Sequence, residues 1–163
     1  MPTFEVNYGG EGTERKTGKR VRVPPPEALR QLGPAFSVTV SITELERNKR
    51  AEFGGETPQP VSGLALIDTG STVTAVDDKV CAKLKLSPTG VIQLQHAGGG
   101  TREAPCYPLQ VLFPGTPLPP LTASRIASVD LGNAPYLLLI GRDLLRRLRM
   151  VYNGPMGRIE ITF

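Results

Sequence analysis

The sequence predicts one mostly β domain with two short helices. Three observations support this prediction: the length, the glycine and proline content, and the repeated alternation of apolar and polar residues. The 163 residues are enough for a single domain with its own core. The 18 glycines and 16 prolines disfavour helix interiors and so argue against a helical bundle. The alternation is typical of strands with one buried face.

The composition excludes several classes of protein. No run of about 18 apolar residues occurs, so we expect no membrane-spanning helix and no membrane partner. The N-terminus lacks a basic segment followed by an apolar stretch, so no secretory signal is expected. Cys81 and Cys106 are too few for a disulfide scaffold or a zinc cluster. We therefore expect a cytoplasmic protein, of bacterial origin, with no metal and no cofactor.

The net charge of +4 is spread evenly along the chain. Residues 1–34 hold six Lys/Arg and four Asp/Glu, and the remainder holds thirteen and eleven, so each part carries +2. Basic clusters occur at 15–22 and 142–149, but the first contains no aromatic residue that could stack on a base. A nucleic-acid partner is therefore not expected; steep salt dependence of binding would indicate one.

The N-terminal segment, residues 1–34, is predicted to be a short strand followed by a flexible basic and proline-rich arm. Residues 3–8 can form the strand, and residues 9–22 are polar and rich in glycine and charge. Three prolines follow, and residues 27–32 can make one helical turn before Gly33-Pro34. A self-cleaved pro-segment and a disordered extension are alternative interpretations of this segment.

The ordered domain is predicted to span residues 35–163. Residues 36–42 alternate between apolar and β-branched polar side chains, as in a half-buried strand. Residues 44–60 are charged and carry Gly-Gly and two prolines, which predicts a surface loop. Residues 63–67 form a short continuous apolar run, which is consistent with a strand buried on both faces.

The second half of this domain continues the β pattern. Asp77 can cap a short helix, and strands near 91–95 and 109–113 flank a glycine-rich tip, which predicts a hairpin. Further strands are expected at 126–129, 136–140 and 159–163. A second short helix should open after Gly141, with Leu144, Leu145 and Leu148 turned inward.

One tripeptide stands out for its chemistry. Asp68-Thr69-Gly70 directly follows the apolar run at 63–67. A carboxylate at the end of a buried strand is costly unless it is hydrogen-bonded or paired. On its own the tripeptide is also explained by a turn that caps a strand. A second apolar–glycine element, Leu138 to Gly141, follows after the predicted hairpin.

In this order the elements resemble the retroviral-type aspartic proteases, the retropepsins, and especially their small bacterial single-domain relatives. The resemblance covers roughly Ala35 to Phe163 and implies a single lobe with a closed, barrel-like sheet. It implies that Asp68 is the catalytic aspartate and that the Thr69 hydroxyl links two active-site loops across a dimer. It also implies that Gly70 faces the substrate and that Ser71 can hydrogen-bond the aspartate.

The remaining implied roles concern substrate binding and assembly. Ala97, Gly98, Gly99 and Gly100 correspond to the tip of a flap that closes over the substrate, and Leu139 to a wall of the substrate pocket. Residues 159–163 correspond to the dimer-forming terminal strand. The sequence departs from the retroviral pattern at Thr72, where an acidic residue usually pairs with the arginine that matches Arg142.

The chemistry itself requires two chains. Peptide hydrolysis needs a base to activate water and an acid to polarise the carbonyl, and two adjacent carboxylates that share one proton supply both. This sequence has one Asp-Thr-Gly, so we expect a homodimer in which two copies of Asp68 cut an extended peptide. The alternative is a catalytically silent peptide-binding or dimerisation module on the same fold.

Other candidate sites are weaker. A Cys–His nucleophile would need His96 beside Cys81 or Cys106, and nothing in the sequence places them together. The glycine run at 98–100 lacks the lysine and helix start of a phosphate-binding loop. Structural roles explain these residues.

Overall fold

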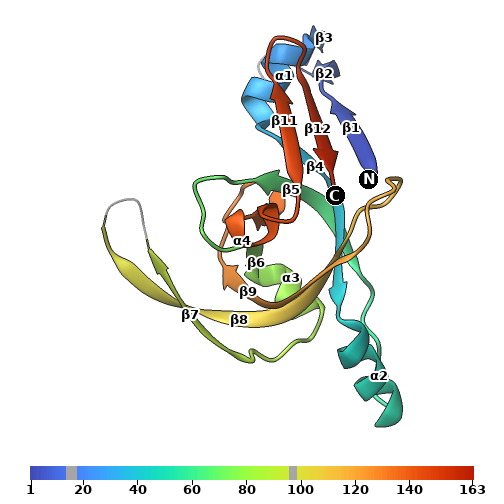
Figure 1. The fold of residues 1–163 in the computed structure, drawn as a ribbon, viewed down its shortest axis with the longest axis vertical. Helices are drawn as coiled ribbons and strands as arrows, with labels where there is room; N and C mark the ends of the chain where they lie inside the picture. Colours follow the sequence, from blue (N-terminus) through green and yellow to red (C-terminus); the bar gives the residue numbers. More distant parts are fainter. Residues whose placement is uncertain (14–17, 96–98) are drawn as a thin grey trace.

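The computed structural model describes residues 1–13, 18–95 and 99–163 and has a closed six-stranded β-barrel at its centre (Figure 1). β7 (Gly90–Gln95) extends the sheet beyond the barrel as a hairpin with β8. The predicted mostly β fold with a closed sheet and a projecting hairpin is therefore confirmed. In spatial order the barrel strands are β4 (Ala35–Ile42), β5 (Val61–Ile67), β10 (Tyr136–Ile140), β6 (Ala75–Asp77), β9 (Leu121–Val129) and β8 (Thr101–Leu112), which closes on β4.

The alternation in β4 fills the barrel interior. Phe36, Val38, Val40 and Ile42 are buried in the main core. β5 lies between β4 and β10, and its pairing with β10 is parallel. Only Ala65 and Ile67 of the apolar run at 63–67 are buried, while Leu64 and Leu66 on the other face are half-buried, so burial on both faces is only partly observed.

The described residues contain four helices where two were predicted. They are α1 (Pro25–Leu32), α2 (Glu44–Glu52), α3 (Asp78–Lys83) and α4 (Arg142–Leu145). α3 is capped by Asp77, as predicted: its Oδ1 accepts from the Lys79 N–H at 2.9 Å. Across the described parts of the chain, no helix is both long and apolar enough to cross a membrane.

The predicted surface loop at 44–60 is wrong for its first half, which forms α2. This helix buries no residue, so it carries no apolar periodicity in the sequence. Local polar contacts stabilise it instead. The Thr43 hydroxyl accepts from the Glu46 N–H at 3.2 Å, and Arg50 pairs with Glu46 one turn away at 2.7 Å.

The described part of residues 1–34 is folded against the domain rather than free of it. β1 (Thr3–Asn7) pairs with β12 (Arg158–Thr162), and β12 also pairs with β11 (Arg149–Asn153). β2 (Gly10–Thr13) and β3 (Arg20–Val23) form a hairpin where a polar arm was predicted. These residues are therefore regular strands and not an irregular segment, while the flexibility of the arm stays a prediction. Residues 14–17 of the basic cluster lie outside the described residues.

Two side chains fasten this N-terminal segment to the rest. The Tyr8 hydroxyl donates to the Ala35 carbonyl at 2.6 Å, and burial raises the pKa of Tyr8 well above its usual range. Leu29 of α1 is fully buried in the main core. The partner of β1 lies some 150 residues away in the sequence, which is why a local pattern could not reveal the pairing.

Leu29→Ala should lower the free energy of unfolding by about 2–5 kcal/mol, because it leaves a cavity in the core. Leu32→Ala on the same helix is the matched control and should cost far less, since Leu32 is 41% exposed. Urea unfolding of the two variants measures the difference. If both variants lowered the free energy of unfolding by the same small amount, α1 would not pack on the domain.

Candidate active site

The two motifs singled out in the sequence meet at the ends of two parallel strands. Asp68 follows β5 directly, and Gly141 follows β10. The Asp68 N–H donates to the Ile140 carbonyl at 3.0 Å. Because the carboxyl ends of paired parallel strands lie at the same edge of a sheet, segments 73 residues apart become neighbours.

The Asp68 carboxylate is fixed by its own loop. Its Oδ1 accepts from the Gly70 N–H at 3.0 Å and from the Ser71 N–H at 3.2 Å. Within the described residues no donor reaches Oδ2, and the side chain is half-buried. A Cβ at position 70 would lie 3.1 Å from Oδ1, so the tight turn favours glycine there. One oxygen is thus oriented, and the other is available to a water or a second group.

Arg142 holds the backbone of this loop. Its Nη1 donates to the Thr69 carbonyl at 2.8 Å and to the Gly70 carbonyl at 3.3 Å. Its Nη2 donates to the Thr72 hydroxyl at 3.1 Å. Thr72 thus supplies the contact that an acidic residue supplies in the retroviral pattern, and the guanidinium clamps the Asp-Thr-Gly turn.

The sequence analysis missed a buried junction under this loop. Thr74 is fully buried, and its N–H and hydroxyl both donate to Asp143, at 3.0 and 2.7 Å. The Thr74 hydroxyl in turn accepts from the Gly141 N–H at 3.1 Å. A Cβ at position 141 would lie 2.4 Å from the carbonyl carbon of Val73. The aspartate that follows Gly-Arg was the one sequence signal for this junction.

A cleft of about 280 Å³ lies beside the Asp-Thr-Gly turn. One wall runs from Gly70, the last residue of the turn, to Val73, and the other is the β7–β8 hairpin, which reaches away from the barrel (Figure 1). Asp68 and Thr69 are not among the residues that line this cleft. Gln93, Leu94 and Gln95 of β7 line it. β7 is the outermost strand of this sheet, so its outer edge is unpaired among the described residues.

The predicted substrate-binding residues are only partly brought to this cleft. Ser71 lines it, although its hydroxyl donates to the Val73 carbonyl at 2.7 Å and not to Asp68. Leu139 packs with the apolar residues Ile92 and Leu94 of β7 against a small alanine cluster. Gly99 and Gly100 lie exposed at the hairpin end. Residues 96–98, which include His96, Ala97 and Gly98, lie outside the described residues.

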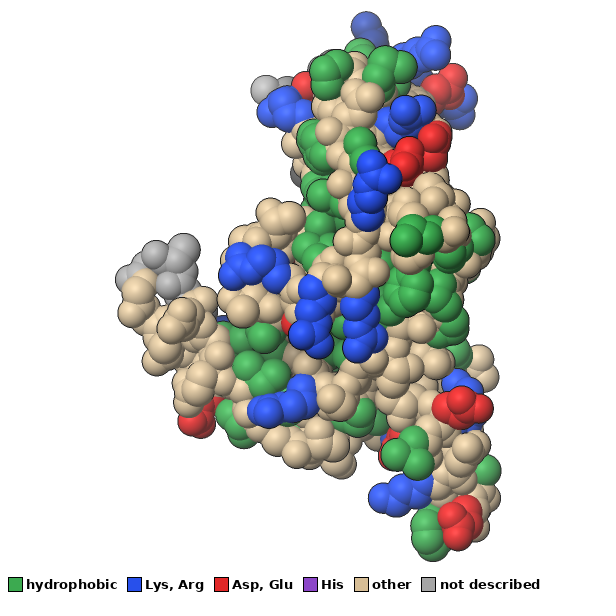
Figure 2. Space-filling model, viewed as in Figure 1, with side chains coloured by type: hydrophobic (Ala, Val, Ile, Leu, Met, Phe, Trp, Pro, Cys, Tyr) green, Lys and Arg blue, Asp and Glu red, His purple; other side chains and the backbone are tan. Residues whose placement is uncertain are grey.

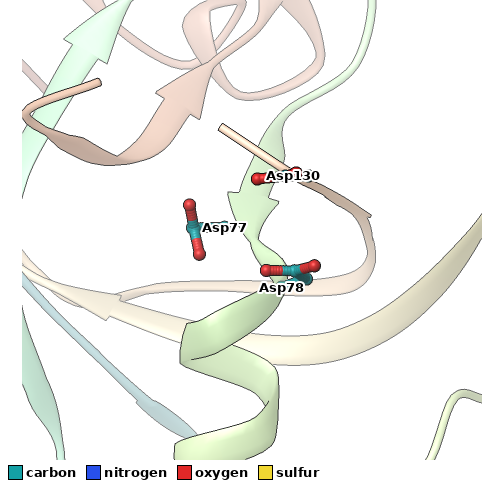
Figure 3. Close-up of side chains that lie close together, drawn as sticks. All are labelled: Asp77, Asp78 and Asp130. Atoms are coloured by element: carbon teal, nitrogen blue, oxygen red, sulfur yellow. The ribbon is translucent and has the colours of Figure 1, made fainter. Parts of the chain in front are cut away.

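Two other groups of reactive side chains are explained by local structure. Carboxylate oxygens of Asp77, Asp78 and Asp130 lie within 4.8 Å of one another (Figure 3). Asp77 caps α3, and Asp130 accepts from the Gly132 N–H at 2.7 Å, so two of the three serve as caps of local turns. We assign no ligand to this cluster.

The cysteines are poor candidates for a nucleophile. Cys81 and Cys106 are both buried and free. Burial raises the pKa of the Cys81 thiol to about 11, and the negative charges of Asp78 and Asp77 add to the rise. A thiol with a raised pKa stays protonated at neutral pH and is therefore a weak nucleophile.

Gly141→Ala should destabilise the protein by about 1–3 kcal/mol, because the new methyl group collides with the Val73 backbone. Gly141 has a negative φ, so the effect is steric and not conformational. Gly100→Ala is the control, since a Cβ there meets no described atom within 4 Å. Thermal unfolding compares the two; a Gly141→Ala melting temperature equal to the wild type would contradict the close packing.

Arg142→Gln should loosen the Asp-Thr-Gly turn without unfolding the domain. Removing an exposed charged donor costs about 0.5–1 kcal/mol, so amide exchange across residues 68–72 should accelerate roughly two- to fivefold. Hydrogen-exchange mass spectrometry measures this rate. Arg146→Gln, an exposed arginine four residues on, is the control and should leave exchange in the turn unchanged.

Comparison with known proteins returns structural neighbours only. No family model and no curated protein matches this chain. The crystal structure of a retropepsin-like aspartic protease from Rickettsia conorii matches with a TM-score of 0.48 and 14% identity, over 98% of this chain and 90% of that one. Lpg0085 from Legionella pneumophila, a protein of unknown function (DUF785), matches with a TM-score of 0.32 and 13% identity, over 66% of this chain and 81% of that one.

At these identities the neighbours identify no catalytic residue in this chain. The closed barrel and the long hairpin agree with the fold that the sequence resemblance implied, whereas the bonds from Arg142 to the Asp-Thr-Gly turn were not predicted. The chain is mostly β with a closed six-stranded barrel, which is consistent with a retropepsin-like fold.

Proposed function

We propose that this protein is an aspartic endopeptidase that acts as a homodimer, with one Asp68 from each chain. The observation that carries this proposal is the state of the Asp68 carboxylate. Loop N–H groups orient Oδ1, and Oδ2 has no donor among the described residues. Asp77 and Asp130 also bond through one oxygen only, but the Asp68 turn is in addition held by Arg142 through the Thr69 and Gly70 carbonyls and borders a cleft.

Two such carboxylates would form the catalytic pair. Carboxylates about 3 Å apart cannot both be ionised, so they hold one proton between them. The ionised member takes a proton from a water molecule as the water oxygen attacks the peptide carbonyl carbon. The protonated member donates to the carbonyl oxygen. When the diol intermediate collapses, the nitrogen takes a proton from the protonated carboxyl and leaves as the C–N bond breaks. The other carboxylate takes a proton from one diol hydroxyl, which gives the acid product and restores the pair.

Residues next to Asp68 fit supporting roles in this reaction. Thr69 is exposed, and its hydroxyl has no partner in the described part of the chain, so it is free to bond to the second copy. Arg142 uses the Thr69 and Gly70 carbonyls to fix the turn. Pre-orienting the acid and base in this way lowers the reorganisation needed in the transition state.

The substrate would bind as an extended strand. β7 offers an unpaired outer edge, and Gln93 to Gln95 line the cleft beside the turn. A peptide that adds to a free sheet edge gains main-chain hydrogen bonds whatever its side chains. Gly99 and Gly100 would then close over it as part of the flap, with Ala97 and Gly98 forming the remainder of the tip.

In this proposal the second copy approaches an outer edge of the three-stranded sheet formed by β1, β12 and β11. Residues 159–163 resembled a strand that pairs with another chain, but both edges of β12 are occupied within this chain by β1 and β11. The outer edge of β11 is the better candidate, because Val151 and Tyr152 on it are 40% and 49% exposed. A two-fold axis beside β11 would pair it antiparallel with its own copy.

Asp68→Asn should reduce peptide cleavage by at least about a hundredfold, because it removes the shared proton and the base. Mass-spectrometric mapping of cuts in a peptide library, from acidic to neutral pH, measures this loss. Asp130→Asn, an exposed aspartate outside the turn, is the matched control and should cleave normally. Cleavage that persists in Asp68→Asn would refute the proposal, and no cleavage by a dimeric wild type would favour the silent peptide-binding module.

Mixing the wild type with Asp68→Asn tests whether each active site needs one Asp68 from each of two chains. If each active unit needs Asp68 from both copies, an equal mixture that exchanges freely should keep only about a quarter of its dimers active. A single-chain enzyme would keep half of the activity. Light scattering on the same samples establishes that dimers are present.

A further inference from the structure

A groove lies on the surface away from the Asp-Thr-Gly turn. Its volume is about 450 Å³, and it opens between α4, β9 and the start of α2. Its apolar lining consists of Pro108, Ala123 and the buried Leu144, with Leu45 at the rim. Leu45 is 81% exposed, so its side chain adds apolar surface beside the groove.

The charge around this groove is mainly positive. Arg125, Arg146 and Arg147 line it together with one acid, Asp143, which leaves +2. Asp143 is already engaged by Thr74, and Arg125 donates to the Val91 carbonyl at 2.8 Å. Arg146 and Arg147 are exposed, and within the described residues neither forms an ion pair. Figure 2 shows basic side chains gathered at the centre of this face, where Figure 1 places α4.

We propose that this groove is a docking site for an acidic peptide segment of a partner protein, one that also carries an apolar side chain. An apolar side chain would fill the hollow over Leu144 and Ala123 and would cover Leu45. Neighbouring aspartates or glutamates would pair with Arg146 and Arg147, whose guanidinium groups can each bind a carboxylate through two N–H donors. Opposite charge would also accelerate association.

The shape of the groove favours a peptide over a nucleic acid. Single-stranded nucleic acids bind to aromatic platforms, and no aromatic residue lines this groove. The groove instead has an apolar floor flanked by Arg146 and Arg147. It therefore fits a peptide in which apolar and acidic side chains alternate. The proposal does not rest on peptidase activity, because Arg146 and Arg147, which carry it, form no bond to the Asp-Thr-Gly turn within the described residues; Asp143 is the one lining residue shared with the Thr74 junction.

Fluorescence anisotropy with a labelled ten-residue peptide of alternating Glu and Leu tests this assignment. The full chain is used with Asp68→Asn as background, so that cleavage cannot obscure binding. The double variant Arg146→Glu/Arg147→Glu should weaken binding at least about tenfold, because it reverses both contacts. Arg22 is an exposed residue of β3 outside the groove, so Arg22→Glu reverses a charge elsewhere on the surface. This control variant should bind the peptide as tightly as the Asp68→Asn background protein does.

Further measurements distinguish binding in the groove from general attraction to the positively charged surface. A peptide with Gln in place of Glu should bind at least about tenfold more weakly, and one with Ser in place of Leu should also bind more weakly. Equal weakening by Arg22→Glu, or no binding of the Glu–Leu peptide at millimolar concentration, would overturn the proposal. So would binding of a polynucleotide or of anionic vesicles that depends on Arg146 and Arg147 while the peptide does not bind.

Discussion

The hydrogen bonds between Thr74 and Asp143 hold the candidate site together. They join the loop after β5 to the loop after β10 through a fully buried threonine and a charged acceptor. Hydrogen bonds to a carboxylate are stronger than neutral ones, and a buried polar group without its partner is costly. Either loop alone would therefore leave an unsatisfied group in the interior, so each specifies the position of the other.

The close packing of Gly141 follows from the same junction. Its N–H reaches the Thr74 hydroxyl only because no side chain separates it from the Val73 backbone. Once these segments are fixed, Arg142 is placed over the turn and can reach two carbonyls and the Thr72 hydroxyl. Asp68 thus sits on a turn whose backbone is held by Arg142 and by the Ile140 carbonyl, and its half-buried carboxylate is oriented through Oδ1.

The sequence predicts the parts of this arrangement that depend on local pattern. The strands at 36–42 and 63–67 and the cap at Asp77 follow from periodicity and residue type, and the structure has these elements, although the second strand is buried on one face only. α2 was not predicted because it buries no side chain and therefore leaves no apolar periodicity in the sequence. The Thr74–Asp143 junction escaped it for a different reason: the partners are 69 positions apart, and their pairing exists only after the barrel closes.

The N-terminal segment shows how such distant pairing changes a functional expectation. In a chain whose terminal strand had a free edge, that strand could associate directly with a second copy. Here β1 occupies one edge of β12 and β11 the other, so β12 is satisfied within one chain. A sheet edge with all its hydrogen bonds made has no drive to pair again. Any dyad of Asp68 must therefore form between domains that are already folded, through a surface that each domain presents complete.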